Sequence, residues 1–257
     1  MFLFSVILWR GRCKADSIEF FDVSSPLGRE EMVLKLNPNT VLKLLVAIVI
    51  CLIGANLIGL ISYFGFDASR LGMFDLDQEG NVPTFYASAS LLFCGALLGV
   101  IAAAKKKQQS KDFVYWLFLS MIFVFLSVDE SASLHERLIT PVREAFSTTG
   151  IFYYAWVIPY GCFVISMMAV YVRFVFALPK KIRFMFLLSG AIFVAGAIGG
   201  EFVGGYWYES YGVDNLTYAV ITMFEESLEM IGVVIFIYAL LSYLGSELSD
   251  VSLGVCD

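Results

Sequence analysis

Six long apolar runs divide this chain, and each is close to the ~20 residues that a helix needs to cross a bilayer. Apolar residues make up 59% of the chain, more than in an ordinary soluble domain. Inside a bilayer, a helix satisfies all its own backbone hydrogen bonds. We therefore predict an all-α polytopic membrane protein, a bundle of six transmembrane helices. The spans are expected at about 41–64, 84–104, 113–134, 152–173, 184–207 and 218–243.

The charges between the spans alternate along the chain. Basic side chains flank one set of span ends, namely Lys35, Lys43, Lys105, Lys106, Lys107, Lys111, Arg173, Lys180, Lys181 and Arg183. The other connections are acidic or balanced, as between Asp67 and Glu79. Basic loops favour the cytoplasmic side, so both termini are predicted to be cytoplasmic. This conclusion requires an even number of spans, and six satisfies it.

The predicted organisation has three parts: an N-terminal segment 1–40, a transmembrane domain 41–244 and a short cytoplasmic tail 245–257. The chain opens with a nine-residue apolar run that is too short to span a bilayer. It also lacks the charged start and the small-residue cleavage site of a signal peptide. We expect the natural start to be Met32, with residues 1–31 upstream of it. N-terminal peptide mapping of the native protein tests this hypothesis.

Composition excludes several classes of partner. A net charge of −6, with one triple-lysine run, argues against nucleic acid, which needs a clustered basic face. The sequence contains neither a Walker-type loop nor a G-x-G-x-x-G motif, which argues against a nucleotide. The five cysteines are scattered, which argues against a disulfide framework or a cysteine zinc site. The expected partner is the lipid bilayer, with a membrane protein or a second copy of the chain as further alternatives.

Two acidic stretches interrupt the apolar runs. The first, SVDESASLHERL, contains the single histidine of the chain, and the second is FEESLEMIG. Ionisable groups inside spans are costly and therefore indicate function by default. The candidate residues for binding a metal or protons are Asp129, Glu130, His135, Glu136, Glu201, Glu225, Glu226 and Glu229.

Helical geometry predicts how these groups are arranged. At about 100° per residue, the three glutamates of the sixth span share one face. If the third helix continues through Glu136, then Asp129 and Glu136 face the bundle and His135 lies near the rim. We expect the third and sixth spans to face one another across a pocket that opens to the outer side of the membrane.

The carboxylates lack basic partners at the same depth. They therefore need protons, water or a metal cation to offset their charge. An oxygen-rich cluster with one imidazole suits a divalent metal ion such as Mg²⁺, Ca²⁺, Mn²⁺ or iron. For single residues there is a simpler interpretation: Glu136 and Glu201 also fit solvated helix ends, and His135 alone fits a hydrogen-bond partner.

Small residues recur every four positions in two spans, which predicts close helix packing. Aromatic residues near span ends, such as Tyr154 and Trp156, are typical of interfacial anchors. The two small-residue rows are Gly95, Gly99 and Ala103 in the second span, and Gly196, Gly200 and Gly204 in the fifth.

Three sequence features together resemble a known group of proteins. They are DExxxxHE from Asp129 to Glu136, EExxE from Glu225 to Glu229, and FDLDQEGNVPTFYASA before the second span. They resemble uncharacterised bacterial multispanning inner-membrane proteins. The resemblance implies a six-helix protein of the bacterial inner (plasma) membrane and brings no named activity. The alkaline-ceramidase-like hydrolases bind zinc through several histidines, which one histidine cannot match.

Three functions fit the acidic cluster. Transport that binds a cation or protons fits it best, because no nucleophile is evident. A metal-dependent membrane enzyme acting on a lipid or prenyl substrate is the alternative, with the ion activating water. The third is a membrane assembly or accessory protein. The sequence leaves open whether the protein is an enzyme, and metal analysis of the purified protein would separate these functions.

Overall fold

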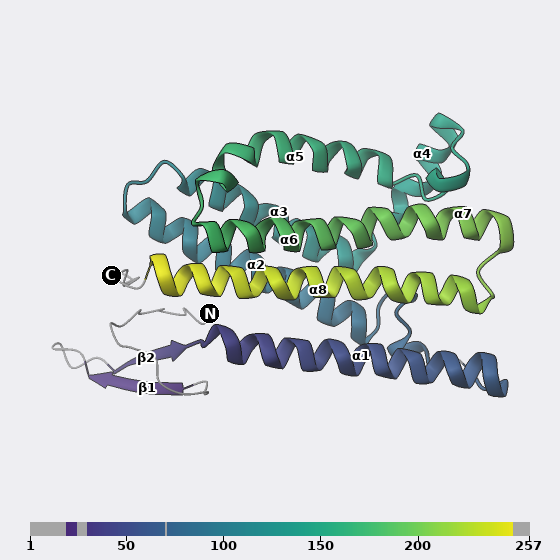
Figure 1. Cartoon of the computed structure of the whole chain (residues 1–257), viewed down its shortest axis with the longest axis horizontal. Coiled ribbons are helices and arrows are strands. Elements are labelled where there is room, and N and C mark those ends of the chain that lie inside the picture. The colour runs from purple at the N-terminus through teal and green to yellow at the C-terminus, as the bar shows by residue number, and fades with distance from the viewer. Residues whose placement is uncertain (1–18, 25–29, 70, 249–257) are drawn as a thin grey trace.

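The computed structural model describes residues 19–24, 30–69 and 71–248, and this part of the chain contains the six predicted helices (Figure 1). The all-α bundle is therefore confirmed, with bounds within a few residues of those predicted. The spans are α1 (Pro38–Phe66), α2 (Val82–Lys107), α3 (Phe113–Ala132), α5 (Val157–Ala177), α6 (Lys180–Val194) continuing into α7 (Glu201–Tyr211), and α8 (Leu216–Glu247).

The shorter elements lie outside the spans. Helix α4 (Ile139–Phe146) follows α3, and strands β1 (Glu19–Ser24) and β2 (Glu30–Lys35) form an antiparallel pair. This hairpin, which the sequence interpretation did not anticipate, lies beside the start of α1 (Figure 1). The proposed upstream segment 1–31 and the tail 245–257 fall largely outside the described residues.

Local sequence signals begin and end the spans. Helices α1, α2 and α8 each start after an asparagine whose side chain accepts a backbone N–H of the first turn, which stabilises the helix start. Helix α3 ends where Ser133 adopts a left-handed conformation, with φ of 48°. Helix α6 passes into α7 through a π-helical turn at Ala195–Gly200.

The two ends of the bundle differ. The connections α1–α2, α3–α5 and α7–α8 lie at one end together with α4, and we call this the α4 end (Figure 1). The start of α1 and the end of α8 lie toward the opposite end, as an even number of spans requires.

Helix α8 is the centre of the bundle, and α5 lies at its edge. Helix α8 contacts α1, α2 and α6, and 56% of its 18-residue apolar stretch is buried inside the protein. The corresponding share for α5 is 11%. The apolar side chains that α5 exposes suit a hydrocarbon surrounding rather than water.

Helices α2 and α3 form a sealed pair. Ser120 Oγ donates a hydrogen bond to the carbonyl of Gly95 at 2.7 Å. Ser88 and Ser127 each donate to the other's carbonyl at 2.8 Å. A Cβ added at Gly95 would lie 2.9 Å from Cγ2 of Val124, so the helices meet as closely as glycine allows.

Helix α5, by contrast, is joined to α3 by two separated tyrosine contacts. The Tyr160 hydroxyl donates to Asp129 Oδ2 at 3.0 Å, near the α4 end. The Tyr171 hydroxyl donates to the carbonyl of Tyr115 at 2.9 Å, toward the opposite end. At a rise of 1.5 Å per residue, the two tyrosines are about 16 Å apart along α5. The space between these contacts belongs to the pocket described below.

Candidate functional site

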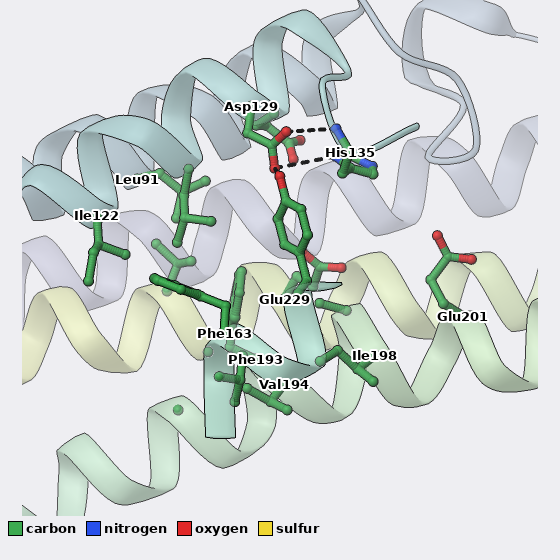
Figure 2. A pocket seen from close by; sticks show the side chains of 18 of the residues that line it. Leu91, Ile122, Asp129, His135, Phe163, Phe193, Val194, Ile198, Glu201 and Glu229 are labelled. Carbon is green, nitrogen blue, oxygen red and sulfur yellow. Dashed lines mark hydrogen bonds and ion pairs between the residues drawn. The ribbon is translucent and has the colours of Figure 1, made fainter. Parts of the chain in front are cut away.

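The end of α3 fixes the position of the histidine. Because Ser133 reverses the chain, the backbone N–H of His135 returns to donate to Asp129 Oδ1 at 2.8 Å. The imidazole Nδ1 lies 3.5 Å from Asp129 Oδ2 (Figure 2). Helix α3 thus does not continue through Glu136, the condition on which the sequence analysis placed His135 near the rim. His135 turns into the pocket instead of lying at its rim, because a left-handed residue ends the helix.

Asp129 is a positioning residue in this arrangement. Only 4% of it is exposed, and its two oxygens accept from His135 and Tyr160. A carboxylate that holds one ring nitrogen fixes the orientation of the imidazole and leaves the other nitrogen for a ligand. Asp129 thus orients His135 and also ties α5 to α3.

Aromatic side chains at the start of α5 complete the surroundings of the imidazole. The ring centroids of Trp156 and His135 are 4.8 Å apart. Trp156 Nε1 donates to Glu201 Oε1 at 2.8 Å. The Tyr154 and Tyr218 hydroxyls are hydrogen bonded at 2.8 Å. Tyr154 and Trp156, interpreted from the sequence as interfacial anchors, therefore line the pocket.

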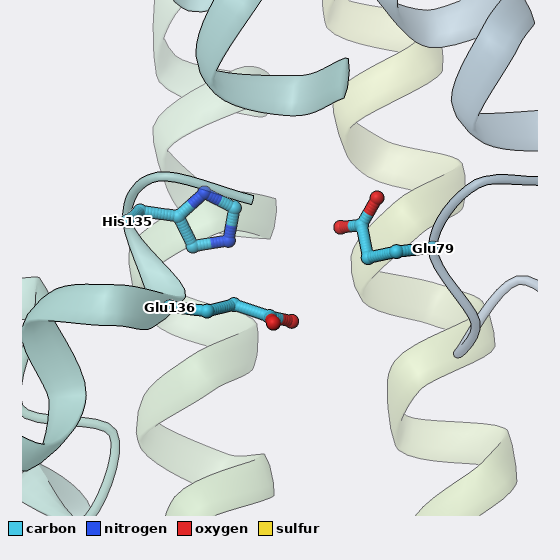
Figure 3. A group of neighbouring side chains, drawn as sticks. All are labelled: Glu79, His135 and Glu136. Carbon is cyan, nitrogen blue, oxygen red and sulfur yellow. The ribbon is translucent and has the colours of Figure 1, made fainter. Parts of the chain in front are cut away.

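Three side chains form a group with the spacing of metal ligands. One ligand atom from each of Glu79, His135 and Glu136 lies within 4.8 Å of the others. Figure 3 shows both carboxylates and a ring nitrogen of His135 directed toward the same space. Glu79 comes from the α1–α2 connection, Glu136 from the turn after α3. If these three side chains moved closer around an ion, their carboxylate oxygens and the imidazole nitrogen would form the kind of ligand set that first-row divalent metals bind.

Sequence reasoning did not select Glu79. It treated this residue only as a loop charge, because no helical period connects it to the other acids. A signal was present in the stretch FDLDQEGNVPTFYASA, where Glu79 directly precedes Gly80 and the Asn81 cap of α2. The Asn81 amide donates to the carbonyl of Asp75 at 2.6 Å, which shapes the turn that carries Glu79.

The pKa values of two groups in this cluster are shifted upward. Limited hydration raises the pKa of Glu79, and the charge of Glu136 adds to this effect. Burial alone would lower the pKa of His135, but the hydrogen bond and charge of Asp129, with smaller effects of Glu130 and Glu136, raise it overall. Both groups therefore hold a proton at higher pH than usual.

All eight candidates from the sequence line one pocket with a volume of about 570 Å³. The structure thus brings Asp129, Glu130, His135 and Glu136 from the α3 region together with Glu201 of α7 and Glu225, Glu226 and Glu229 of α8. The same pocket continues away from the carboxylates as an apolar chamber between α3, α5, α6 and α8. Figure 2 shows Ile122, Phe163, Phe193 and Val194 in this part.

The glycine row of the fifth span makes room for glutamates. A Cβ at Gly200 would lie 2.7 Å from both Cβ and Cγ of Glu225. One at Gly196 would lie 2.9 Å from Cγ of Glu229 and 2.8 Å from the carbonyl oxygen of Glu225. The predicted close packing is present, and its consequence is that the acidic face of α8 fits against the π-helical turn.

The charge of the pocket is strongly unbalanced. Nine carboxylates and one histidine line it, with no lysine or arginine among the described lining residues. Arg143, a nearby cation in sequence, donates instead to the carbonyl of Tyr153 at 2.6 and 3.0 Å. Protons, water or a cation must therefore offset the negative charge.

An all-α bundle with six potential membrane spans and a carboxylate–histidine pocket inside it defines a multi-pass membrane protein with an internal polar site. The chain belongs to the family described as Domain of unknown function (DUF8692), whose model matches residues 41–244. No curated protein and no solved structure matches the chain. The match extends from the first turn of α1 to the last turn of α8 and thus includes every residue of the site.

Proposed function

We propose that this protein is a metal-dependent membrane enzyme that hydrolyses a membrane-soluble substrate. The metal ligands are Glu79, His135 and Glu136. The observation that carries the proposal is the continuity of the pocket: a group with metal-ligand spacing opens directly onto an apolar chamber. Sites that bind small molecules commonly have this composition, mostly apolar with a few convergent polar groups.

The chain's own residues divide the chemistry between them. A bound divalent ion lowers the pKa of a coordinated water and polarises the bond to be cleaved. Glu130 lies in the same pocket, interacts electrostatically with Glu79 and His135, and is the proposed proton acceptor. The water oxygen bonds to the electrophilic carbon, its proton passes to Glu130, and the same proton then goes to the leaving group as its bond breaks.

Transport of a cation or protons is the second candidate. The carboxylates of the pocket extend from Glu136 at the α4 end to Glu229 within α8. Such a row supports the passage of a cation or of protons over that depth. Beyond them the pocket is lined by apolar residues such as Leu119 and Phe236, and a hydrated ion gains nothing from such a lining. We therefore favour the enzyme. Uptake of Mn²⁺ by proteoliposomes would favour transport.

We further propose the bacterial inner membrane as the location, with both termini cytoplasmic. The proposal rests on the distribution of basic residues and on the resemblance described above. It places the α4 end on the outer side. A reporter fused after Leu244 should behave as cytoplasmic and one inserted near Asp75 as periplasmic. The opposite pattern would reverse the side from which the pocket opens.

Metal binding by purified protein tests the proposed function. Wild type should bind one Mn²⁺, measured by calorimetry and by electron paramagnetic resonance. Glu79→Gln should weaken binding strongly, because one of three protein ligands is lost. Glu144→Gln is the matched control, since Glu144 is an exposed acid in α4. Equal binding by both variants would contradict the assigned ligands.

A further inference from the structure

The apolar chamber has a defined entrance, length and end. Several side chains both line it and are exposed on the outer surface. On α5 these are Met168, Val172 and Phe176, with exposed fractions of 69%, 48% and 59%, and on α6 Leu187 is 51% exposed. Surface residues that also line a cavity mark where it opens. The chamber thus opens sideways between α5 and α6, where the surroundings are hydrocarbon rather than water.

Aromatic rings line the far part of the chamber. Phe123 of α3 and Phe236 of α8 are stacked with centroids 4.8 Å apart, and Phe186 meets Phe236 edge to face at the same distance. All three line the pocket, and fully buried Trp116 packs behind Phe186. From Glu225 to Phe236 along α8 the pocket, with its acidic part included, is about 16 Å long. This length and lining suit a single extended hydrocarbon chain.

The charge at the other end restricts the headgroup. The pocket holds nine carboxylates, and one divalent cation offsets two negative charges. The described lining has no lysine or arginine to receive a phosphate or a carboxylate. An anionic headgroup would therefore be repelled, whereas an amine or an uncharged headgroup would not.

We propose that the chamber binds a single-chain amphiphile with a cationic or uncharged headgroup, which enters from the bilayer between α5 and α6 with its chain end against Phe123, Phe186 and Phe236. This inference rests on the proposed function, because it names the substrate class of the same site. It excludes phosphorylated and other anionic lipids as substrates.

Photolabelling in nanodiscs tests the inference, with a diazirine-bearing dodecylamine and the matching dodecyl phosphate as probes. The amine should label the protein roughly tenfold more than the phosphate, on peptides from α3, α5, α6 or α8. Equal or stronger labelling by the phosphate would overturn the headgroup assignment. Label confined to other helices would overturn the chamber assignment.

A glycine offers a way to fill the chamber. Gly190 lines the pocket, and a Cβ added there meets nothing within 4 Å. Gly190→Phe should therefore reduce amine labelling to background, whereas Gly54→Phe should not. Gly54 is the matched control, because its Cβ position is equally open but lies on α1 outside the pocket. Unchanged labelling of Gly190→Phe would contradict the proposal.

Mn²⁺ binding measured on the same samples separates the two proposals. Wild type that binds Mn²⁺ but does not take up the amine would overturn the substrate class and leave the metal site standing. Wild type that takes up the amine but binds no Mn²⁺ would overturn the metal-dependent function. Retained Mn²⁺ binding by Gly190→Phe shows that the variant is folded, and the position of the label in wild type tests the chamber without any variant.

Discussion

Helix α3 has two neighbours that it contacts in opposite ways. Against α2 it is sealed by Gly95 and by serine hydroxyls that donate to backbone carbonyls across the interface. Against α5 its hydrogen bonds are the two tyrosine contacts, joined near Tyr171 by the rings of Tyr115 and Trp116 packing on Phe174, with a chamber between the two contact points. The difference shows how a small bundle can keep one rigid pair while leaving a cavity beside it. Close backbone contact provides stability on one side, and specific hydrogen bonds keep the other side attached without filling it.

Larger side chains at the α2–α3 interface and in the chamber should give the largest contrast in stability. Gly95→Leu should destabilise the protein by about 3 kcal/mol, because its Cβ would lie 2.9 Å from Val124 and its side chain would force the helices apart. Gly190→Leu should change stability by about 0.5 kcal/mol or less, since the space is open. Equilibrium unfolding in detergent measures both. Equal losses would show that the chamber side at Gly190 of α6 is packed as tightly as the interface of α2 with α3.

Removing the aspartate that links α3 to α5 should have the next largest effect. Asp129→Asn should weaken Mn²⁺ binding by about 10–100-fold, because His135 loses its orienting carboxylate. Asp112→Asn is the control at the other end of α3, where the side chain makes no capping hydrogen bond. If calorimetry gives both variants wild-type affinity, Asp129 does not position a ligand.

Lowering the pH should weaken Mn²⁺ binding in the pocket, on the side of α3 that faces α5. The pKa values of Glu79 and His135 are raised, so protons compete with the metal at higher pH than they would at ordinary groups. Mn²⁺ affinity should fall as pH is lowered, by about tenfold per pH unit for each proton that binding must displace. Calorimetry in buffers of different ionisation enthalpy counts those protons. Affinity that is independent of pH would contradict a site built from these two groups.

The smallest effect is expected from one hydroxyl of the sealed pair. Ser120→Ala removes the donor to the Gly95 carbonyl and should cost about 0.6 kcal/mol, the average for such bonds between membrane helices. Ser166→Ala on α5 removes only a bond within the same helix and should cost less. A larger loss for Ser166 would reverse the assignment of rigid and open sides.

The spans were predictable because bilayer thickness sets their length, and the acids were predictable because their cost inside a span is high. What helical periodicity could not give was the geometry after α3. Ser133 leaves the helix by a backbone conformation that serine seldom adopts, and this alone moves His135 from the rim into the pocket. Glu79 was missed for a related reason, since a turn rather than a repeat places it opposite the histidine.

The π-helical turn at Ala195–Gly200 also has a consequence for how this protein can change. A π turn contains one residue more than the α-helical turn it replaces, so the helix segments on its two sides do not share a single register. Deleting one residue there would rotate α7 by about 100° relative to α6. Glu201 would then turn away from Trp156, while the packing of α6 on α8 would stay as it is. The deletion of a single codon would therefore remove the Glu201 carboxylate from the pocket.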